Sequence, residues 1–327
     1  MSRIHKSDSG AALLSVLLIV ALMSVAALAM IEGTGSAITQ SRTADARASL
    51  AWHIAGTEEA GFVGVDRLRE GGLANINDLT PGFRTPFEAD INGAAITTLL
   101  EDASNCFNLN SLRTIGDELD EDNEAAELYL VLLIAAGLDE SDAEELSATL
   151  MDWLDPDTSA RLRGAEDNFY STLETPYRTS GQPLASISEL RAIRGYTKKI
   201  VDALEHLVCV RSTEEINPFN INTLLVEQAP LLSMAFGGNL NVDDALAILL
   251  RRPSGGWAST EMLLEESAID LIAPEARRTD LLSIRSSFIE LRGRLDAGGQ
   301  SDEFAILYVL AENQPTQIVR RRYGIAR

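Results

Sequence analysis

Residues 9–31 read SGAALLSVLLIVALMSVAALAMI, and this stretch decides the fold. The 21 residues 11–31 carry no charge. At about 1.5 Å per residue, a transmembrane helix of this length spans a hydrocarbon core of about 30 Å. The segment before it contains Arg3, His5 and Lys6 with one acid, Asp8. The positive-inside rule therefore predicts one inner-membrane anchor, with residues 1–10 in the cytoplasm and the bulk of the chain in the periplasm.

Three fates of this anchor are consistent with the sequence. Ala27-Leu28-Ala29 offers small residues to a secretory peptidase, which would release a soluble domain. Gly10 separates the charged leader from the apolar run and resembles the cleavage glycine of type IV pilins and type II secretion pseudopilins. In those proteins a prepilin peptidase cuts after the glycine, the helix is kept, and the new first residue, here Ala11, is methylated. The apolar run is long for the core of a simple signal peptide, which favours the pilin-like interpretation, and a plain uncleaved anchor is the third possibility.

Helical periodicity continues beyond the anchor. Apolar residues recur at loosely helical spacing until Gly71-Gly72, namely Ile38, Leu50, Ile54, Val65 and Leu68. We therefore predict an amphipathic continuation of the helix over residues 32–72. Pilin-like subunits pack this second half on a sheet, and their fifth mature residue is usually a glutamate that pairs with a neighbour's N-terminus. Ser15 occupies that position here, which favours a place at the end of a filament over one in its shaft.

Strand signals lie on both sides of a long helical region. The turn Asn92-Gly93 between residues 87–91 and 94–100 predicts a hairpin. Three more strands are expected near the C-terminus, at residues 287–295, 304–311 and 316–322. The predicted fold is therefore α+β, with a pilin-like core of long helix and small antiparallel sheet, residues 73–111 and 286–327, and a large all-helical insertion, residues 112–285.

An internal repeat divides the predicted insertion. Residues 107–112, FNLNSL, recur as residues 219–224, FNINTL, which predicts two related subdomains over residues 112–210 and 219–285. Asparagine before serine or threonine caps helix starts well, because its side-chain oxygen accepts from amides of the first turn. Two helix starts therefore explain the repeat without a ligand.

The composition disfavours several functions. The formal charge is −22, and residues 101–170 hold nineteen acids against three arginines, so a phosphate backbone would be repelled. The chain contains neither a G-x-S-x-G nucleophile elbow nor a G-x-x-x-x-G-K phosphate loop, and no histidine lies near a nucleophile motif. We therefore expect no enzymatic activity.

Two cysteines and a group of acids remain as candidate sites. Cys106 and Cys209 flank the first subdomain. In the periplasm a disulfide is favoured, worth roughly 4–5 kcal/mol by loop closure, and the alternative is two buried thiols that never meet. The acids Asp152, Asp155, Asp157, Glu166 and Asp167 surround a loop containing Gly164. They offer the several oxygens that calcium requires, but their spacing is not that of an EF-hand, and solvated acids at helix ends are the alternative.

The order of these motifs resembles the type II secretion system protein K family, the large minor pseudopilins. The resemblance runs from the glycine-bounded leader through CFNLN, DWLDPD, GAED, SEL and FNINT, and covers nearly the whole chain. It implies a pilin-like core with a helical insertion, a disulfide, and calcium bound at Asp155, Asp157, Glu166 and Asp167, with Asp152 less certain. It also implies a place at the pseudopilus tip with I- and J-type minor pseudopilins, above the major pseudopilin, after processing by the prepilin peptidase and extraction by the inner-membrane assembly platform.

Two other functions are consistent with parts of the sequence. The FNINT and SEL motifs with Arg194-Gly195 are similar to helix-hairpin-helix modules, which bind DNA phosphates, so a membrane-anchored DNA-uptake protein is the first alternative. Those modules require a Gly-hydrophobic-Gly hairpin beside lysines, whereas Tyr196-Thr197 follow Gly195 here and the subdomain is acidic. The second alternative, a membrane-anchored periplasmic enzyme, lacks a supporting motif.

Overall fold

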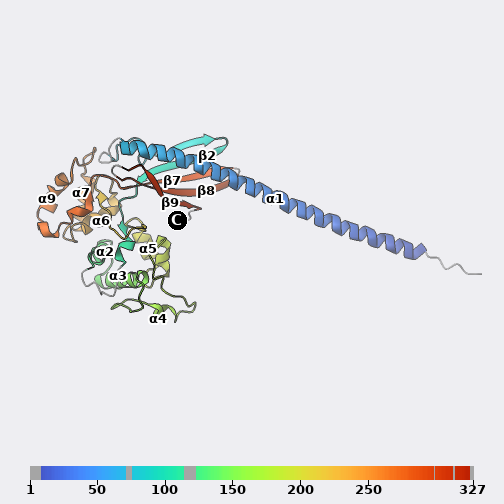
Figure 1. Cartoon of the computed structure of the whole chain (residues 1–327), viewed down its shortest axis with the longest axis horizontal. Helices are drawn as coiled ribbons and strands as arrows, with labels where there is room; N and C mark the ends of the chain where they lie inside the picture. The colour runs from blue at the N-terminus through green and yellow to red at the C-terminus, as the bar shows by residue number, and fades with distance from the viewer. Residues whose placement is uncertain (1–8, 71–75, 114–122, 298, 312–313, 325–327) are drawn as a thin grey trace, which may run out of the picture.

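A long helix projects from a body in which a sheet and a helical region lie side by side (Figure 1). The computed structural model of the 327-residue chain describes residues 9–70, 76–113, 123–297, 299–311 and 314–324. Helix α1, Ser9–Glu70, is 62 residues long, and at 1.5 Å per residue it reaches about 93 Å. Of the predicted leader, residues 1–8 lie outside the described residues, and Gly10 and Ala11 fall in the first turn of α1.

The two halves of α1 differ in their contacts. Leu13–Asp45 is the one described segment that is long and apolar enough to cross a membrane, and none of its most apolar window is buried within the chain. Ile54 and Val65 are buried against the sheet. Ile38, expected on the same packing face, is 54% exposed, because α1 extends beyond the end of the sheet by that point. The helix ends at Glu70, directly before the predicted Gly71-Gly72 stop.

Five antiparallel strands form the sheet in the order β1-β2-β7-β8-β9. Their bounds are β1 Phe87–Ile91, β2 Ala94–Asp102, β7 Phe288–Ala297, β8 Gln300–Val309 and β9 Gln317–Tyr323. Asn92 and Gly93 both have positive φ, as a two-residue type I′ turn requires. Strands β2 and β7 pair along their whole length although the insertion separates them in sequence. The predicted strands and the interrupted sheet are thus confirmed.

Between β2 and β7 the chain is mainly helical. The helices are α2 Glu124–Ala135, α3 Glu140–Leu154, α4 Asp167–Tyr170, α5 Lys198–Leu204, α6 Ala229–Met234, α7 Val242–Leu250, α8 Thr260–Leu264 and α9 Ser267–Asp270, and the 3₁₀ turns are η2 Leu109–Leu112, η3 Ile187–Ala192, η4 Val226–Gln228, η5 Pro274–Ala276 and η6 Thr279–Leu281. One apolar cluster runs through both predicted subdomains, from Phe107 to Leu282, and a separate cluster lies between α1 and the sheet.

The repeated motif closes each half of the insertion in the same way. Strand β3, Phe107–Asn108, pairs in parallel with β4, Val208–Cys209, and strand β5, Phe219–Asn220, pairs in parallel with β6, Leu282–Ser283. The second asparagine of each copy then clamps a distant backbone: Asn110 bonds both the N–H and the C=O of Leu184, and Asn222 does the same to Trp257. The repeat therefore has a structural role in both copies.

We predict opposite effects of two alanine substitutions on α1. A Cβ at Gly61 would lie 2.5 Å from Leu291 and 2.8 Å from the hydroxyl of Tyr308, whereas a Cβ at Gly56 meets nothing within 4 Å. Gly61→Ala should therefore destabilise the protein by about 1–3 kcal/mol through overpacking. Gly56→Ala should be neutral or stabilise it by up to about 1 kcal/mol through helix propensity. Denaturant unfolding of the detergent-solubilised chain measures both, and equal effects would contradict the close approach of α1 to the sheet.

Candidate functional site

Three of the predicted acids meet at the end of α3. Asp152 lies in the last turn of α3, Asp155 is its C-cap residue, and Glu166 is the N-cap residue of α4. All three are buried, and a carboxylate oxygen from each lies within 4.8 Å of the other two. The structure thus brings together Asp155 and Glu166 with Asp152, the acid that the resemblance supported least.

The other two predicted ligands lie outside this cluster. The carboxylate of Asp167 accepts hydrogen bonds from the backbone N–H and hydroxyl of Thr179, at 2.9 and 3.1 Å. Asp157 is exposed, and its carboxylate accepts from the backbone N–H of Ser159 at 2.6 Å. Both acids therefore stabilise the loop that follows α3 rather than meeting Asp152.

Burial disfavours the ionised form of the three clustered carboxylates. It raises the pKa of Glu166 to about 7, with further contributions from the charges of Asp152 and Asp155. It also raises the pKa of Asp152 and Asp155, although the guanidinium of Arg161 opposes that shift. Arg161 donates to Asp152 at 2.8 Å and forms a shorter contact with Asp155. One guanidinium faces three carboxylates, so the cluster lacks positive charge.

The donor set fits a divalent cation bound by oxygen. Asp155 Oδ1 and Glu166 Oε1 are buried without a hydrogen-bond partner, so two oxygens of different residues are available as ligands. Gly164 leaves room beside them, because a Cβ there would lie 1.9 Å from Asp152 Oδ2. Hard cations such as Ca²⁺ prefer carboxylate oxygens in irregular, loop-borne sites of this kind.

The disulfide lies where the insertion joins the sheet. Cys106 and Cys209 are bonded, with their Cα atoms 5.6 Å apart. Cys106 immediately precedes β3 and Cys209 belongs to β4, so the bond holds the two chain ends of the first subdomain together.

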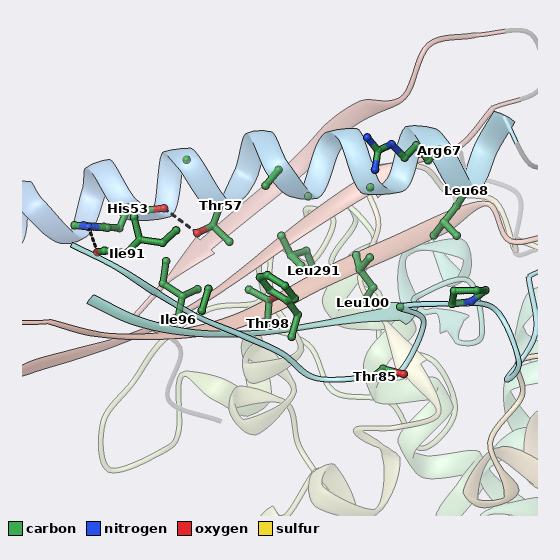
Figure 2. Close-up of a pocket in the computed structure, with 18 of the residues that line it drawn as sticks. His53, Thr57, Arg67, Leu68, Thr85, Ile91, Ile96, Thr98, Leu100 and Leu291 are labelled. Carbon is green, nitrogen blue, oxygen red and sulfur yellow. Dashed lines mark hydrogen bonds between the residues drawn. The ribbon is translucent and has the colours of Figure 1, made fainter. Parts of the chain in front are cut away.

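An apolar groove runs between α1 and the β1–β2 hairpin (Figure 2). Its volume is about 970 Å³. Leu68 of α1 faces Leu100 of β2 across it, and His53 Nε2 contacts the carbonyl of Ile91 at 3.1 Å. Trp52 beside it is 79% exposed. This groove was not predicted from the sequence, although Gly56, Ala60 and Gly64, spaced four residues apart on α1, were a signal for it.

Two of the basic residues beside the Gly195 hairpin pair with acids of the same chain. Lys198 pairs with Asp202 at 2.5 Å, and Arg194 pairs with Glu145 at 3.1 Å. The amide side chains of both repeat copies bond backbone groups of the protein itself. The helix-hairpin-helix alternative therefore has no support in this geometry.

A long N-terminal helix whose second half covers an antiparallel sheet defines the pilin-like class of filament subunits. Family models described as type II secretion system (T2SS), protein K match residues 105–213 and 219–285. The chain belongs to this family, whose members are minor pseudopilins.

Relatives with the same description extend over almost the whole chain. The type II secretion system protein K of Pectobacterium carotovorum subsp. carotovorum is 33% identical over 326 residues, covering 96% of each chain. That of Klebsiella pneumoniae is 31% identical over 323 residues, covering 97% of this chain and 96% of its own. The fold is similar to a chain of the GspK-GspI-GspJ complex of enterotoxigenic Escherichia coli, with a TM-score of 0.76, 24% identity, and coverage of 88% of this chain and 100% of that one.

We predict that calcium removes a pH-dependent loss of stability. The pKa of Glu166 is about 7 in the folded chain and about 4.3 when unfolded. Without calcium the folded state therefore binds more protons, and stability falls as the pH rises from about 4 to 7. Bound calcium would hold the ionised carboxylates and should flatten this dependence, adding about 2.7 kcal/mol at a concentration a hundredfold above its Kd.

Thermal unfolding between pH 5 and 8, in EGTA and in calcium, measures this effect. Glu166→Gln should remove the largest part of the pH dependence and weaken the response to calcium, while Asp152 and Asp155, whose pKa burial also raises, leave a smaller dependence. Glu174→Gln, which removes an exposed acid from the same region, should leave both unchanged. A wild-type melting curve that is indifferent to calcium at every pH would refute the site.

We also predict a large contribution of the disulfide. Replacing Cys106 and Cys209 together with serine opens a loop with a sequence separation of 103, which should cost roughly 4–5 kcal/mol in the chain-entropy model. Urea unfolding of the double variant measures the loss, with reduced wild-type protein as the control. A loss below about 1 kcal/mol would show that other contacts already hold this junction together.

Proposed function

We propose that this minor pseudopilin occupies the tip of the type II secretion pseudopilus, where it initiates or caps the filament and supports export of folded proteins. The contrast between the two ends of the chain supports this position. The most apolar part of α1 is not buried against any described part of the chain, whereas the body carries a helical region beside its sheet (Figure 1). The first feature suits a helical bundle, and the second would block another subunit from stacking above.

The proposal includes a path from the membrane to the filament. The chain is a single-pass inner-membrane protein with its leader in the cytoplasm and its body in the periplasm. Prepilin peptidase cuts after Gly10, Ala11 becomes the methylated first residue, and the assembly platform draws α1 into a bundle above the major pseudopilin. Ser15 supplies no carboxylate to pair with a neighbour's N-terminus, which suits a subunit at the end.

I- and J-type minor pseudopilins are the proposed partners. The similar solved chain comes from a complex of GspK with GspI and GspJ. The exposed surface of α1, together with the groove beside Trp52, offers apolar area to helices of such partners. The role is structural and includes no catalytic step, and calcium at Asp152, Asp155 and Glu166 stabilises the periplasmic body.

Removing the insertion tests the tip position. Ser104 Oγ accepts from the backbone N–H groups of Ser287 and Phe288, at 2.8 and 3.0 Å, so a short linker can replace residues 105–285 without moving β2 or β7. We expect the excised chain carrying Ser15→Glu to lose capping, giving longer pseudopili and less secreted protein. Ser15→Glu in the intact chain should still cap, because the insertion remains.

Filament length by electron microscopy and the amount of secreted protein in the medium are the readouts, with equal expression of the variants checked by immunoblot. Unchanged length and secretion in the excised Ser15→Glu chain would refute the tip position. N-terminal sequencing of the membrane-derived protein tests processing independently, since a start at Ala11 distinguishes the prepilin peptidase from the other two fates.

A further inference from the structure

A polar pocket lies at the junction between the sheet and the first subdomain. Its volume is about 360 Å³, and the disulfide between Cys106 and Cys209 forms part of its wall. Although the whole chain carries a charge of −22, five guanidinium groups line this pocket: Arg84, Arg211, Arg292, Arg320 and Arg322. Five acids also line it: Glu101, Asp102, Asp202, Glu205 and Glu290.

The acids of the pocket are not paired one to one with the arginines. Glu290, which is buried, is shared by three guanidinium groups, those of Arg292 at 2.6 Å, Arg322 at 3.2 Å and Arg320 at 3.9 Å. These arginines pull the pKa of Glu290 below its usual range despite its burial. Glu290 is therefore shared by three cations on strands β7 and β9, and of these only Arg292 has a second carboxylate, Glu101, within 4.0 Å among the described residues.

The remaining acids are occupied elsewhere or lie at the rim. Asp102 accepts from the N–H of Ser104 and from the hydroxyls of Thr223 and Ser286, and its charge acts on Arg211 from a greater distance than a salt bridge. Glu101 shares Arg292 at 3.4 Å, and Asp202 pairs with Lys198. Glu205 is exposed at the C-terminal end of α5.

Arg211 is the most deeply buried cation of the pocket. It is 7% exposed, and no carboxylate among the described residues lies within 4.0 Å of its guanidinium. Its Nη2 donates to the carbonyl of Ala103, and the group lies 4.5 Å above the ring of Phe288. Burial and the neighbouring charge of Arg320 lower the pKa of Arg211 to about 10. Buried charges are normally paired, so this position is short of an anion.

Hydrogen-bond acceptors are missing at the same place. The Nε–H groups of Arg211, Arg320 and Arg322 are buried and have no acceptor in the described structure. Arg320 bonds only a carbonyl, that of Val210 at 3.0 Å, in addition to its long contact with Glu290. Each of these three guanidinium groups therefore keeps one buried N–H without an acceptor, and Glu290 is the one carboxylate within 4.0 Å of Arg320 and Arg322 among the described residues.

We propose that this pocket binds one oxyanion group, a carboxylate or a phosphate, held by Arg211, Arg320 and Arg322. Planar guanidinium groups match two oxygens of such a group at once. The volume admits a small anion or a single side-chain head group. The ligand comes either from free inorganic anion or from a carboxylate of a polypeptide. Its binding would fasten the segment after β4 to strand β9, and so the insertion to the sheet.

Thermal unfolding of the full chain in detergent tests the pocket, with inorganic phosphate replacing chloride at constant ionic strength and pH. The wild type should show a saturable rise in melting temperature. Arg320→Gln and Arg322→Gln should each weaken the apparent affinity about tenfold or more, because a hydrogen bond to a charged group is lost. Arg294→Gln is the matched control, because Arg294 lies on the same sheet, is paired with Asp296 and lies outside the pocket.

Phosphate also stabilises proteins through exclusion from their surfaces, but that effect does not saturate and is common to all variants. An equal shift in the wild type, Arg320→Gln and Arg294→Gln would therefore overturn the proposal. A competition experiment then identifies the source of the anion. It compares acetyl-Gly-Asp-Gly-amide with acetyl-Gly-Asn-Gly-amide as competitors of phosphate. Displacement of phosphate by the aspartyl peptide alone indicates a polypeptide carboxylate, and displacement by neither indicates a free anion.

Discussion

The pairing of β2 with β7 is the constraint on which the rest of the molecule depends. The two strands run antiparallel from Ala94 opposite Ala297 to Asp102 opposite Ile289, although the whole insertion lies between them in sequence. The chain must therefore leave the sheet and return to it at neighbouring points. Ser104, Cys106 and Asp102 all act at this junction, through the backbone of β7, the disulfide and the hydroxyl of Ser286. The insertion is thus held at its base, while its helices form a core of their own.

The two buried polar sites have charge imbalances of opposite sign. At the end of α3, one arginine faces three carboxylates, an imbalance that the proposed cation would offset. At the junction, three arginines share Glu290, and the proposed anion would offset their excess charge. Both imbalances are costly only because the groups are buried, where water does not screen them. Although the chain is strongly negative overall, one of its buried sites therefore lacks positive charge and the other lacks negative charge.

Local patterns predicted the elements of this fold better than its sites. The Asn92-Gly93 turn and the apolar run of α1 are encoded by adjacent residues, so the sheet and the long helix were predictable. The exposure of Ile38 was not, because it depends on where the sheet ends. The predicted calcium ligands were five acids close in sequence, but only burial separates Asp152 from the solvated Asp157. The arginine pocket could not be predicted from the sequence, because Arg211 and Arg320 lie on distant segments that only the fold brings together.

One of the two edges of the sheet has a consequence for handling the protein. Strand β1 has β2 on one side and, among the described residues, no strand on the other, so its outer N–H and C=O groups are available to a strand from a second molecule. The strand is only five residues long, and Pro86 precedes it. His53 already contacts the carbonyl of its last residue, Ile91. Edge-to-edge aggregation at high concentration is therefore restrained at both ends of the strand, and substitutions at Pro86 or His53 would lower the solubility of the body before they lowered its stability.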